Sequence, residues 1–306
     1  SVRAVAHARF RRTIAMAAWV SAARLITFRY RCKRCGNIDP TFRSHKLQWF
    51  RNSDMELVLY KVESHIARIT LNRPEKRNAL TPELLEGILA ALDRAAKEPD
   101  VTVVLIRGEG KDFCAGFDLK EFNRRGSRDV MNNLDDARAL ANILLAIRRH
   151  PRPVICAVQG RALGGGGGIA AASDLTVATD TAKIGYPEVN IGYVPAMVAS
   201  LVTRAVSDKR MFEMFATGEP VAAPDAAAMG LINHVFPEAE FDAKVEEYVA
   251  KIAQKSASAL SLTKRLLYQI DGQTFEKAVE TGMYFNVIGR MTEDAQRGFE
   301  KFAKKE

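Results

Sequence analysis

The segment GRALGGGGG, residues 160–168, decides how this chain folds. It directly follows an apolar run typical of a buried strand, residues 154–158, and it precedes small apolar residues, 169–172, that suit a helix. Glycines between a strand and a helix leave N–H groups accessible and let a ligand approach the backbone closely. We therefore predict an α/β fold with a ligand site at this turn, where open α/β sheets tend to bind ligands.

Two nucleotide-binding motifs also contain glycine-rich turns. A P-loop is excluded here because no Gly-Lys-[Ser/Thr] ending follows the glycines. A GxGxxG match is automatic within five consecutive glycines, so it carries little information. On its own, the run has a second interpretation, a flexible turn that permits close packing of a helix on a strand.

Strands and helices alternate along much of the chain, as in an α/β protein. Apolar and β-branched runs predict strands over residues 57–60, 66–71, 101–106, 154–158 and 174–178. A helix is expected to begin after Thr81 as N-cap, with Pro82 in its first turn. Beyond Pro195 the strand pattern nearly vanishes, and helices are predicted over residues 196–205, 208–216, 224–229, 239–254, 257–270, 274–288 and 292–304.

The net charge of +9 is concentrated in an N-terminal extension, residues 1–54. This segment holds 12 of the 45 Lys and Arg residues but only two of the 36 Asp and Glu residues. The body is therefore nearly neutral, and its charge does not indicate a nucleic-acid partner. No run approaches the roughly 20 apolar residues of a membrane span, so a membrane is not expected as a partner either.

The extension has two interpretations. Its richness in Arg and Ala and its lack of acids fit a mitochondrial transit peptide. It also fits upstream sequence translated from a wrongly chosen start, because Met55 directly precedes the first patterned strand. We favour the second interpretation and expect a poorly ordered extension on a cytoplasmic protein. The first would place the protein in the mitochondrial matrix.

Four cysteines, Cys32, Cys35, Cys114 and Cys156, are too few and too scattered for a disulfide framework. They favour a reducing compartment. Cys32 and Cys35 have the spacing of half a zinc site, but no second pair follows to complete four ligands. No metal is therefore expected.

A second glycine-bearing loop, GEGKDFCAGFDLK at residues 108–120, directly follows the strand predicted over 101–106. This loop, the glycine run, NRPEKRNAL at 72–80, GYPEVNIGYVP at 185–195 and the segment 227–235 resemble, in order, the signatures of the crotonase superfamily, the enoyl-CoA hydratase/isomerase family. The resemblance runs from about residue 55 to the C-terminus. It implies an α/β fold, a spiral of ββα repeats over residues 55–250, with a helical C-terminal region, 251–306, that mediates homotrimers, commonly paired into hexamers.

The resemblance also implies a chemistry for the two glycine-bearing loops. In that family the thioester carbonyl of an acyl-CoA accepts hydrogen bonds from two backbone N–H groups, and the matching donors here are Phe117 and Gly165. Such donors stabilise the negative charge of a thioester enolate, and removing one typically costs ~10²–10³ in rate. Because both donors are backbone groups, the shape of each loop matters more than its side chains.

The acid–base residues depart from those of the best-known hydratases. Those enzymes carry two glutamates. One resembles Glu188 of this chain, but the position of the other is matched here by Gly168, which has no side chain. Hydration needs both a base for water and an acid for the α-carbon, a pair of tasks most easily divided between two carboxyls. One carboxylate suffices to move a proton between carbons, as in the family's Δ3,Δ2-isomerases. Gly168 therefore raises the case for isomerisation.

Further matches concern coenzyme A, which is part of the substrate and not a separate cofactor. Its phosphates call for cations and its adenine for a backbone pocket. The residues that the resemblance assigns to it are Ala115 at the adenine, Lys120 near the phosphates, Lys76 and Arg77 in the first loop, and Phe302 and Lys305 from a neighbouring subunit.

The sequence thus predicts an enzyme that processes an acyl-CoA, with enoyl-CoA hydratase placed first and Δ3,Δ2-enoyl-CoA isomerase a close second. Decarboxylase or thioesterase chemistry on a CoA substrate comes third. A non-catalytic acyl-CoA-binding or structural protein is the alternative from a different class, and Gly168 favours it. Asp118 is expected to support its loop, and Tyr186 and Tyr193 are expected to pack.

Overall fold

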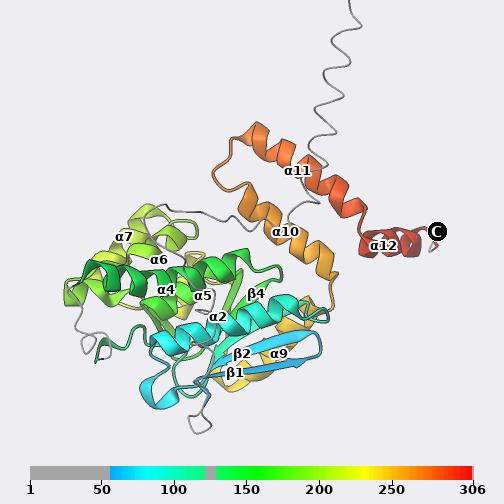
Figure 1. Ribbon diagram of the computed structural model, residues 1–306. Helices are drawn as coiled ribbons and strands as arrows, with labels where there is room; N and C mark the ends of the chain where they lie inside the picture. The colour runs from blue at the N-terminus through cyan, green and yellow to red at the C-terminus, as the bar shows by residue number, and fades with distance from the viewer. Residues whose placement is uncertain (1–55, 121–128, 305–306) are drawn as a thin grey trace, which may run out of the picture. The chain divides into compact units, whose positions relative to one another are not determined.

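The larger of two sheets has six strands in the computed structural model, which describes residues 56–120 and 129–304. Its strand order is β1-β2-β3-β4-β6-β9, with β1 and β2 antiparallel and every later pair parallel (Figure 1). The strands are β1 (Val58–Glu63), β2 (Ile66–Leu71), β3 (Val103–Gly108), β4 (Val154–Val158), β6 (Leu175–Thr179) and β9 (His234–Phe236). The strands predicted from the sequence all lie in this sheet.

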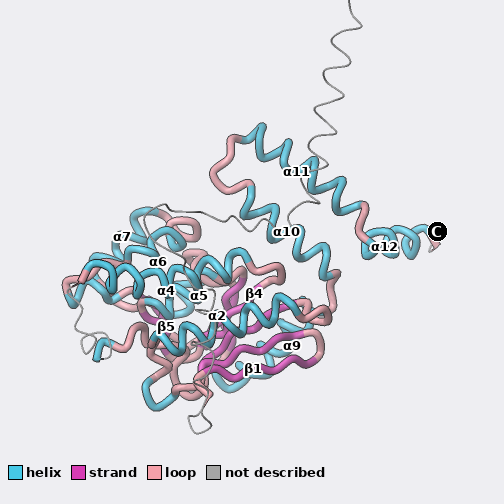
Figure 2. The backbone as a smooth tube through the Cα atoms, in the orientation of Figure 1, coloured by secondary structure: helices cyan, strands magenta, loops and turns pink. Residues whose placement is uncertain are grey.

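A smaller sheet of three strands, β5 (Arg161–Leu163), β7 (Lys183–Gly185) and β8 (Val221–Ala222), takes up the chain between strands of the larger one. The chain passes from β4 to β5, turns into helix α5 (Gly165–Ala172), and returns to the large sheet as β6 before continuing into β7. Figure 2 shows β4 and β5 with the helices around them. This strand–strand–helix alternation is the repeat predicted from the sequence.

Helices cover both faces of the large sheet. On one face α2 (Pro82–Lys97) and α4 (Val130–Arg149) bury Leu84, Ile88 and Ile143 against alternate strand residues such as Val104 and Ile106. On the other face α9 (Phe241–Ala253) packs on the intervening residues, among them Val103 and Leu105. Because side chains alternate across a strand, a continuous apolar run is what a sheet covered on both faces requires.

The start of α2 is set by its N-cap, as the sequence predicts. The side-chain oxygen of Thr81 accepts a hydrogen bond from the N–H of Leu84 at 3.3 Å, and Pro82 occupies the first turn. The N-cap thereby satisfies one of the amides that every helix start leaves without an intrahelical partner.

Two parts of the prediction differ from the structure. The predicted helix over residues 169–172 begins four residues earlier, because the glycines themselves form the first turn of α5. The strands β5, β7, β8 and β9 were not predicted, since each is too short for a periodic pattern. β9 nevertheless adds a parallel edge strand to the large sheet through its pairing with β6.

The remaining helices follow the predicted segments closely. They are α6 (Ala196–Val202), α7 (Asp208–Thr217), α8 (Ala223–Ala228), α10 (Ala257–Gln269), α11 (Phe275–Arg290) and α12 (Glu293–Ala303), with short 3-10 turns at η1 (Pro74–Lys76), η2 (Pro187–Ile191) and η3 (Glu238–Glu240). No helix in residues 56–120 and 129–304 is long and apolar enough to span a membrane. The predicted extension, 1–54, lies outside the described residues.

Helix α10 is tied to the sheet by a buried lysine. Nζ of Lys264 lies 2.7 Å from Oδ2 of Asp174 and donates to the carbonyls of Ile147 and Arg152, at 2.8 and 3.1 Å. Tyr268, one turn further along α10, donates to the other oxygen of Asp174. Burial lowers the pKa of Lys264, while the nearby Asp174 carboxylate opposes that shift. Loss of either partner would leave the other charge buried without compensation.

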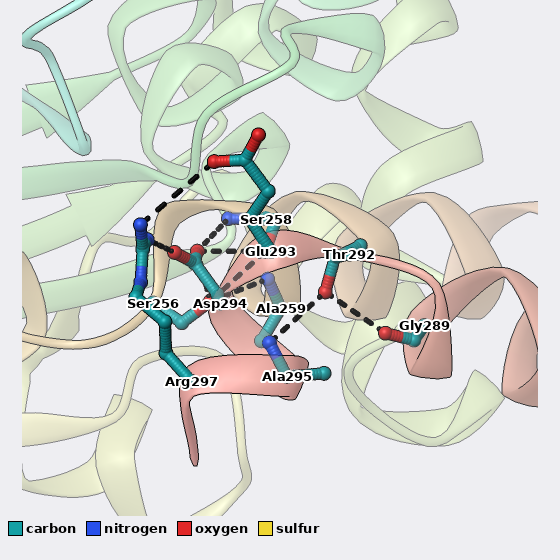
Figure 3. Close-up of polar contacts among 9 residues, drawn as sticks. All are labelled: Ser256, Ser258, Ala259, Gly289, Thr292, Glu293, Asp294, Ala295 and Arg297. Carbon is teal, nitrogen blue, oxygen red and sulfur yellow. Dashed lines mark hydrogen bonds and ion pairs between the residues drawn. The ribbon is translucent and has the colours of Figure 1, made fainter. Parts of the chain in front are cut away.

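A second polar cluster joins the N-terminal ends of α10 and α12. The carboxylate of Asp294 accepts hydrogen bonds from the hydroxyls of Ser256 and Ser258, at 2.6 and 2.7 Å, and pairs with Arg297 (Figure 3). These donors hold the pKa of Asp294 well below its usual range, with the two serines as the leading cause. The ionised form of Asp294 therefore stabilises this junction.

We expect Asp294→Asn to loosen α12 from α10, because a neutral amide accepts more weakly than a carboxylate. Amide hydrogen exchange over residues 293–303 should accelerate about fivefold, the equivalent of one typical hydrogen bond. In the unchanged protein the same opening should appear on acidification: a carboxyl with a depressed folded pKa contributes above the unfolded pKa of an aspartate and loses that contribution as pH falls. Exchange in Asp294→Asn that matches the unchanged protein at neutral pH would contradict this role.

Candidate active site

The glycine run forms a tight turn from β5 into α5. Gly164 is the N-cap of α5 and has a φ of +51°, in the left-handed region that favours glycine. Its carbonyl accepts the N–H of Gly168 at 2.9 Å. The Gly164–Gly165 peptide is trans, so the N–H of Gly165 points away from that carbonyl, outward from the helix start. The N–H of the predicted donor Gly165 is therefore directed beyond the helix N-terminus, although the residue itself is buried.

The loop after β3 holds the second predicted donor in the same manner. The carbonyl of Gly116 accepts the N–H of Leu80 at 2.8 Å, and the N–H of Asp118 donates to the carbonyl of Leu80 at 3.0 Å. Because the Gly116–Phe117 peptide is also trans, the N–H of Phe117 points away from Leu80. Both predicted donors are thus oriented by an engaged carbonyl on the same peptide.

The two turns are in direct contact. A β-carbon added to Gly116 would lie 3.0 Å from the carbonyl oxygen of Leu163, and one added to Gly164 would lie 3.9 Å from Cα of Gly116. A β-carbon on Gly166 would overlap Cys114, at 2.6 Å from its carbonyl oxygen, so the helix approaches the loop too closely for any side chain. The structure therefore brings the loops that carry Phe117 and Gly165 together.

Glu188 lies against the same turn. It stands in the first turn of η2, and its Oε1 would be 3.2 Å from a β-carbon added to Gly164. Its other oxygen, Oε2, is buried and has no hydrogen-bond partner among the described residues. Burial raises the pKa of Glu188 above the usual value. A half-buried carboxylate with an unpaired oxygen beside the start of α5 is suited to accept or deliver a proton.

The surroundings of Gly168 are aliphatic. A β-carbon at this position would lie 3.0 Å from Val198 Cγ2 and 3.6 Å from Leu144 Cδ2. Gly168 is one helical turn beyond Gly164, on the same side of α5. The place where the best-known hydratases carry another glutamate is thus bounded here by two buried aliphatic side chains.

The residues predicted to contact coenzyme A are spread along the rim of the loops. Ala115 is half-buried, and its N–H donates to the carbonyl of Arg77 at 3.0 Å. Lys76, Arg77 and Lys120 are exposed, as cations that meet a phosphate need to be. Arg77 lies 3.9 Å from the buried carboxylate of Asp112. Their roles toward coenzyme A stay predictions.

Two C-terminal residues, Phe302 and Lys305, were predicted to serve the site of a neighbouring subunit. Phe302 lies on α12 with 72% of its surface exposed. Lys305 lies outside the described residues. Both assignments stay predictions.

Two of the three predicted supporting roles hold. Asp118 supports its loop, with one oxygen accepting the N–H of Lys120 and the other paired with Arg73. Tyr186 is fully buried, as predicted, and its hydroxyl donates to the carbonyl of Gly167 at 3.3 Å. The prediction that Tyr193 packs is wrong, since 57% of its surface is exposed.

Sequence reasoning missed the residues that hold the first loop in shape, Arg73 and Asn78. Asn78 has a φ of +52° and is completely buried, although it is polar. The motif itself contained a signal: an asparagine tolerates the left-handed region and can bond neighbouring backbone.

Comparison with known proteins agrees with this architecture. The family profile described as enoyl-CoA hydratase/isomerase matches residues 61–306. A Mus musculus protein named enoyl-CoA hydratase domain-containing protein 3, mitochondrial, is 31% identical over 83% of this chain and 84% of its own length. The crystal structure of an enoyl-CoA hydratase from Mycobacterium smegmatis has a TM-score of 0.78 and 33% identity, covering 81% of this chain and 96% of that one.

The crystal structure of human enoyl coenzyme A hydratase domain-containing protein 3 is similar to the same extent. Its TM-score is 0.78 and its identity 31%, with 81% of this chain and 98% of that one covered. The chain therefore belongs to the enoyl-CoA hydratase/isomerase family and has the crotonase fold, as its motifs predicted.

We expect Glu188→Gln to raise the thermal stability at neutral pH by a small amount, of the order of 1–2 °C. The sign follows from the raised pKa: the folded state disfavours the ionised carboxylate, so that cost is present above the folded pKa and vanishes once the group is protonated in both states. The gain should therefore disappear near pH 4 in a thermal-unfolding series.

Glu280→Gln is the matched control for this measurement. Glu280 is exposed on α11, and its hydrogen bond and ion pair with Lys277 lower its pKa, so its loss should not stabilise the protein. An equal rise in the unfolding temperature of both variants would show that the added stability does not come from removing the buried charge of Glu188.

Proposed function

We propose that the protein is an acyl-CoA-processing enzyme that moves a proton at the α-carbon of a thioester, with enoyl-CoA hydratase as its first activity. The thioester oxygen accepts hydrogen bonds from the N–H groups of Phe117 and Gly165, and Glu188 is the acid and base. The observation that carries the proposal is the buried, unpaired oxygen of Glu188 beside the start of α5. Two oriented amides stabilise charge on an enolate oxygen by several kcal/mol in a water-excluded site.

In hydration, Glu188 manages both proton transfers. Its carboxylate takes a proton from water as the oxygen bonds to the β-carbon of a 2-enoyl-CoA. The electron pair of the double bond moves into the thioester, which becomes an enolate held by the two amides. The enolate then re-forms its carbonyl as the α-carbon takes the proton from Glu188. The raised pKa of this carboxyl suits it to donate a proton at neutral pH.

Δ3,Δ2-enoyl-CoA isomerase is the second candidate, and the surroundings of Gly168 favour it. Val198 and Leu144 bound this position, where a second carboxyl would otherwise assist the addition of water. Isomerisation needs only one group, which removes a proton from the α-carbon of a 3-enoyl-CoA and returns it to the γ-carbon. Glu188 alone balances that reaction.

Coenzyme A enters this proposal as part of the substrate, with neither a separate cofactor nor a metal. Lys76, Arg77 and Lys120 are exposed and are proposed to meet its phosphates, with Ala115 at the adenine. We propose that Phe302 and Lys305 of a neighbouring subunit complete the site. Buffer without added metal should therefore support full activity.

The proposed assembly is a homotrimer, with pairing into a hexamer as a further step. Helix α11 supports it with a stripe of exposed apolar side chains at intervals of four residues, Phe275, Val279, Met283 and Val287, each more than half exposed. Such a stripe marks one face of a helix that a partner can bury. The proposed compartment is the cytoplasm, or the mitochondrial matrix if residues 1–54 are a transit peptide.

Purified protein should test the activity directly. With crotonyl-CoA, loss of the absorbance of the conjugated thioester indicates hydration; with a 3-enoyl-CoA, its gain indicates isomerisation. Glu188→Gln should lower either rate at least ~10²-fold and leave the affinity for acyl-CoA unchanged, since general acid–base catalysis contributes about 10²–10⁴. Full activity of Glu188→Gln would refute the assignment of the base. Binding of acyl-CoA with neither reaction would favour the non-catalytic alternative.

Light scattering after size exclusion should test the assembly. We expect the unchanged chain to elute with the mass of a trimer or a hexamer. Met283→Lys should reduce that mass, because it places a charge within the apolar stripe of α11. Val62→Lys, at an exposed position on β1, is the control and should not change it. A monomeric mass for the unchanged chain would refute the proposed assembly.

A further inference from the structure

The loop at residues 72–80 determines where the N–H of Phe117 points. Three backbone hydrogen bonds join it to the loop after β3: Leu80 donates to Gly116, Asp118 donates to Leu80, and Ala115 donates to Arg77. The peptide that carries the Phe117 N–H accepts the first of these bonds through the carbonyl of Gly116, and the next peptide donates the second through the N–H of Asp118. Any shift of Leu80 is therefore transmitted to the proposed oxyanion donor.

That loop is held in a conformation it would not adopt alone. Arg77 and Asn78 are consecutive residues with a φ of +52°, in a region that is sparsely populated by residues other than glycine. The Asn78 side chain compensates: its Oδ1 accepts the N–H of Arg73 at 2.8 Å, and its Nδ2 donates to the carbonyls of Glu109 and Asp112, each at 2.9 Å. Asn78 thus fixes the middle of this loop to the loop that follows β3.

Arg73 spans the two loops. Its Nη1 donates to the carbonyl of Ala79 at 3.0 Å, and its Nη2 lies 3.0 Å from Oδ2 of Asp118. The side chains of Arg73 and Asp118 are 18% and 16% exposed, so water screens this pair only partly. The guanidinium therefore holds the residue before Leu80 and the residue after Phe117 at a set separation. A planar fork with two separate donors suits this task, and an ammonium group does not.

We propose that Arg73 is a positioning residue for the Phe117 N–H, acting through Ala79 and Asp118 without touching the substrate. This inference rests on the proposed function, since it assumes that the Phe117 N–H binds a thioester oxygen. Its physical basis is the sensitivity of preorganised donors: a misplacement of about 1 Å costs on the order of 10²-fold in rate. Because the negative charge on the thioester oxygen develops in the transition state, the loss of Arg73 should reduce kcat more than it raises KM.

The test uses Arg73→Ala and Arg73→Lys, with the infrared carbonyl stretch of a bound, saturated acyl-CoA that carries ¹³C at the thioester carbon. In the unchanged protein, hydrogen bonds from two amides should lower that stretch relative to the free thioester. Arg73→Ala should lose part of this shift and lower kcat by about 10–100-fold. Arg73→Lys keeps the charge but not the planar fork of donors. Its carbonyl shift and its kcat should lie between those of the unchanged protein and those of Arg73→Ala.

Three controls separate positioning from general damage. Arg204→Ala removes an ion pair of similar kind, Arg204–Asp271, on the exposed surface and should leave both the shift and kcat unchanged. Glu188→Gln should abolish turnover yet keep the shift, which shows that the stretch reports the donors and not the base. If Arg73→Ala does not fold, Asp118→Asn removes the same ion pair without a change in size. It should likewise reduce the size of the shift and lower kcat.

The two failures are distinguishable. No shift and no turnover in the unchanged protein would refute the proposed function itself. A shift in the unchanged protein that persists undiminished in Arg73→Ala or Asp118→Asn, with kcat within twofold, would refute the positioning role of Arg73 and leave the proposed function intact.

Discussion

The close contact between two backbone turns is the constraint on which this site depends. A β-carbon on Gly116 would lie only 3.0 Å from the carbonyl oxygen of Leu163, the residue before Gly164, and the carbonyl on each donor peptide is already engaged. Amide groups cannot rotate independently of their carbonyls, so two satisfied acceptors fix the directions of two donors. The remainder of the architecture serves this contact: β3 of the large sheet leads into one loop, β5 of the small sheet leads into the other, and α5 begins where the two meet. Side-chain identity at Phe117 is therefore secondary, which explains why a large residue is tolerated there, whereas a β-carbon at Gly165 would lie 2.7 Å from Leu80 Cδ1.

Much of this arrangement could be predicted from the sequence, and the failures have physical causes. The buried strands and the N-cap at Thr81 were predictable because periodicity and capping are local properties. The strand β9 was missed because three residues are too few to show a period, and its place in the sheet depends on pairing with β6 far away in the chain. Arg73 was missed for a related reason: its partner Asp118 is distant in sequence, and only the folded loops bring the two together. The loop order was predictable through motifs, while the unpaired oxygen of Glu188 required coordinates.

The environments of Glu188 and Gly168 together bear on which proton transfers the proposed site can serve. One carboxylate is kept partly from water with an oxygen unsatisfied, a costly state for a purely structural residue. At Gly168, one turn beyond Gly164 on α5, the corresponding acid is absent and two aliphatic side chains stand nearby. A site of this kind concentrates acid–base work on a single group. Reactions in which one proton leaves and returns on the same face suit it better than reactions that need two simultaneous transfers.

The late position of β9 has a consequence for how the protein is made. The edge of β6 that pairs with β9 is synthesised well before β9 itself, because β7, two further helices and α8 intervene. A nascent chain leaving the ribosome therefore carries the open backbone edge of β6 for some time, a template for mispairing with other chains. α9, which covers the outer face of the sheet, emerges later still. A chain whose synthesis stops between these elements would have a sheet with neither its last strand nor the helix that covers one face.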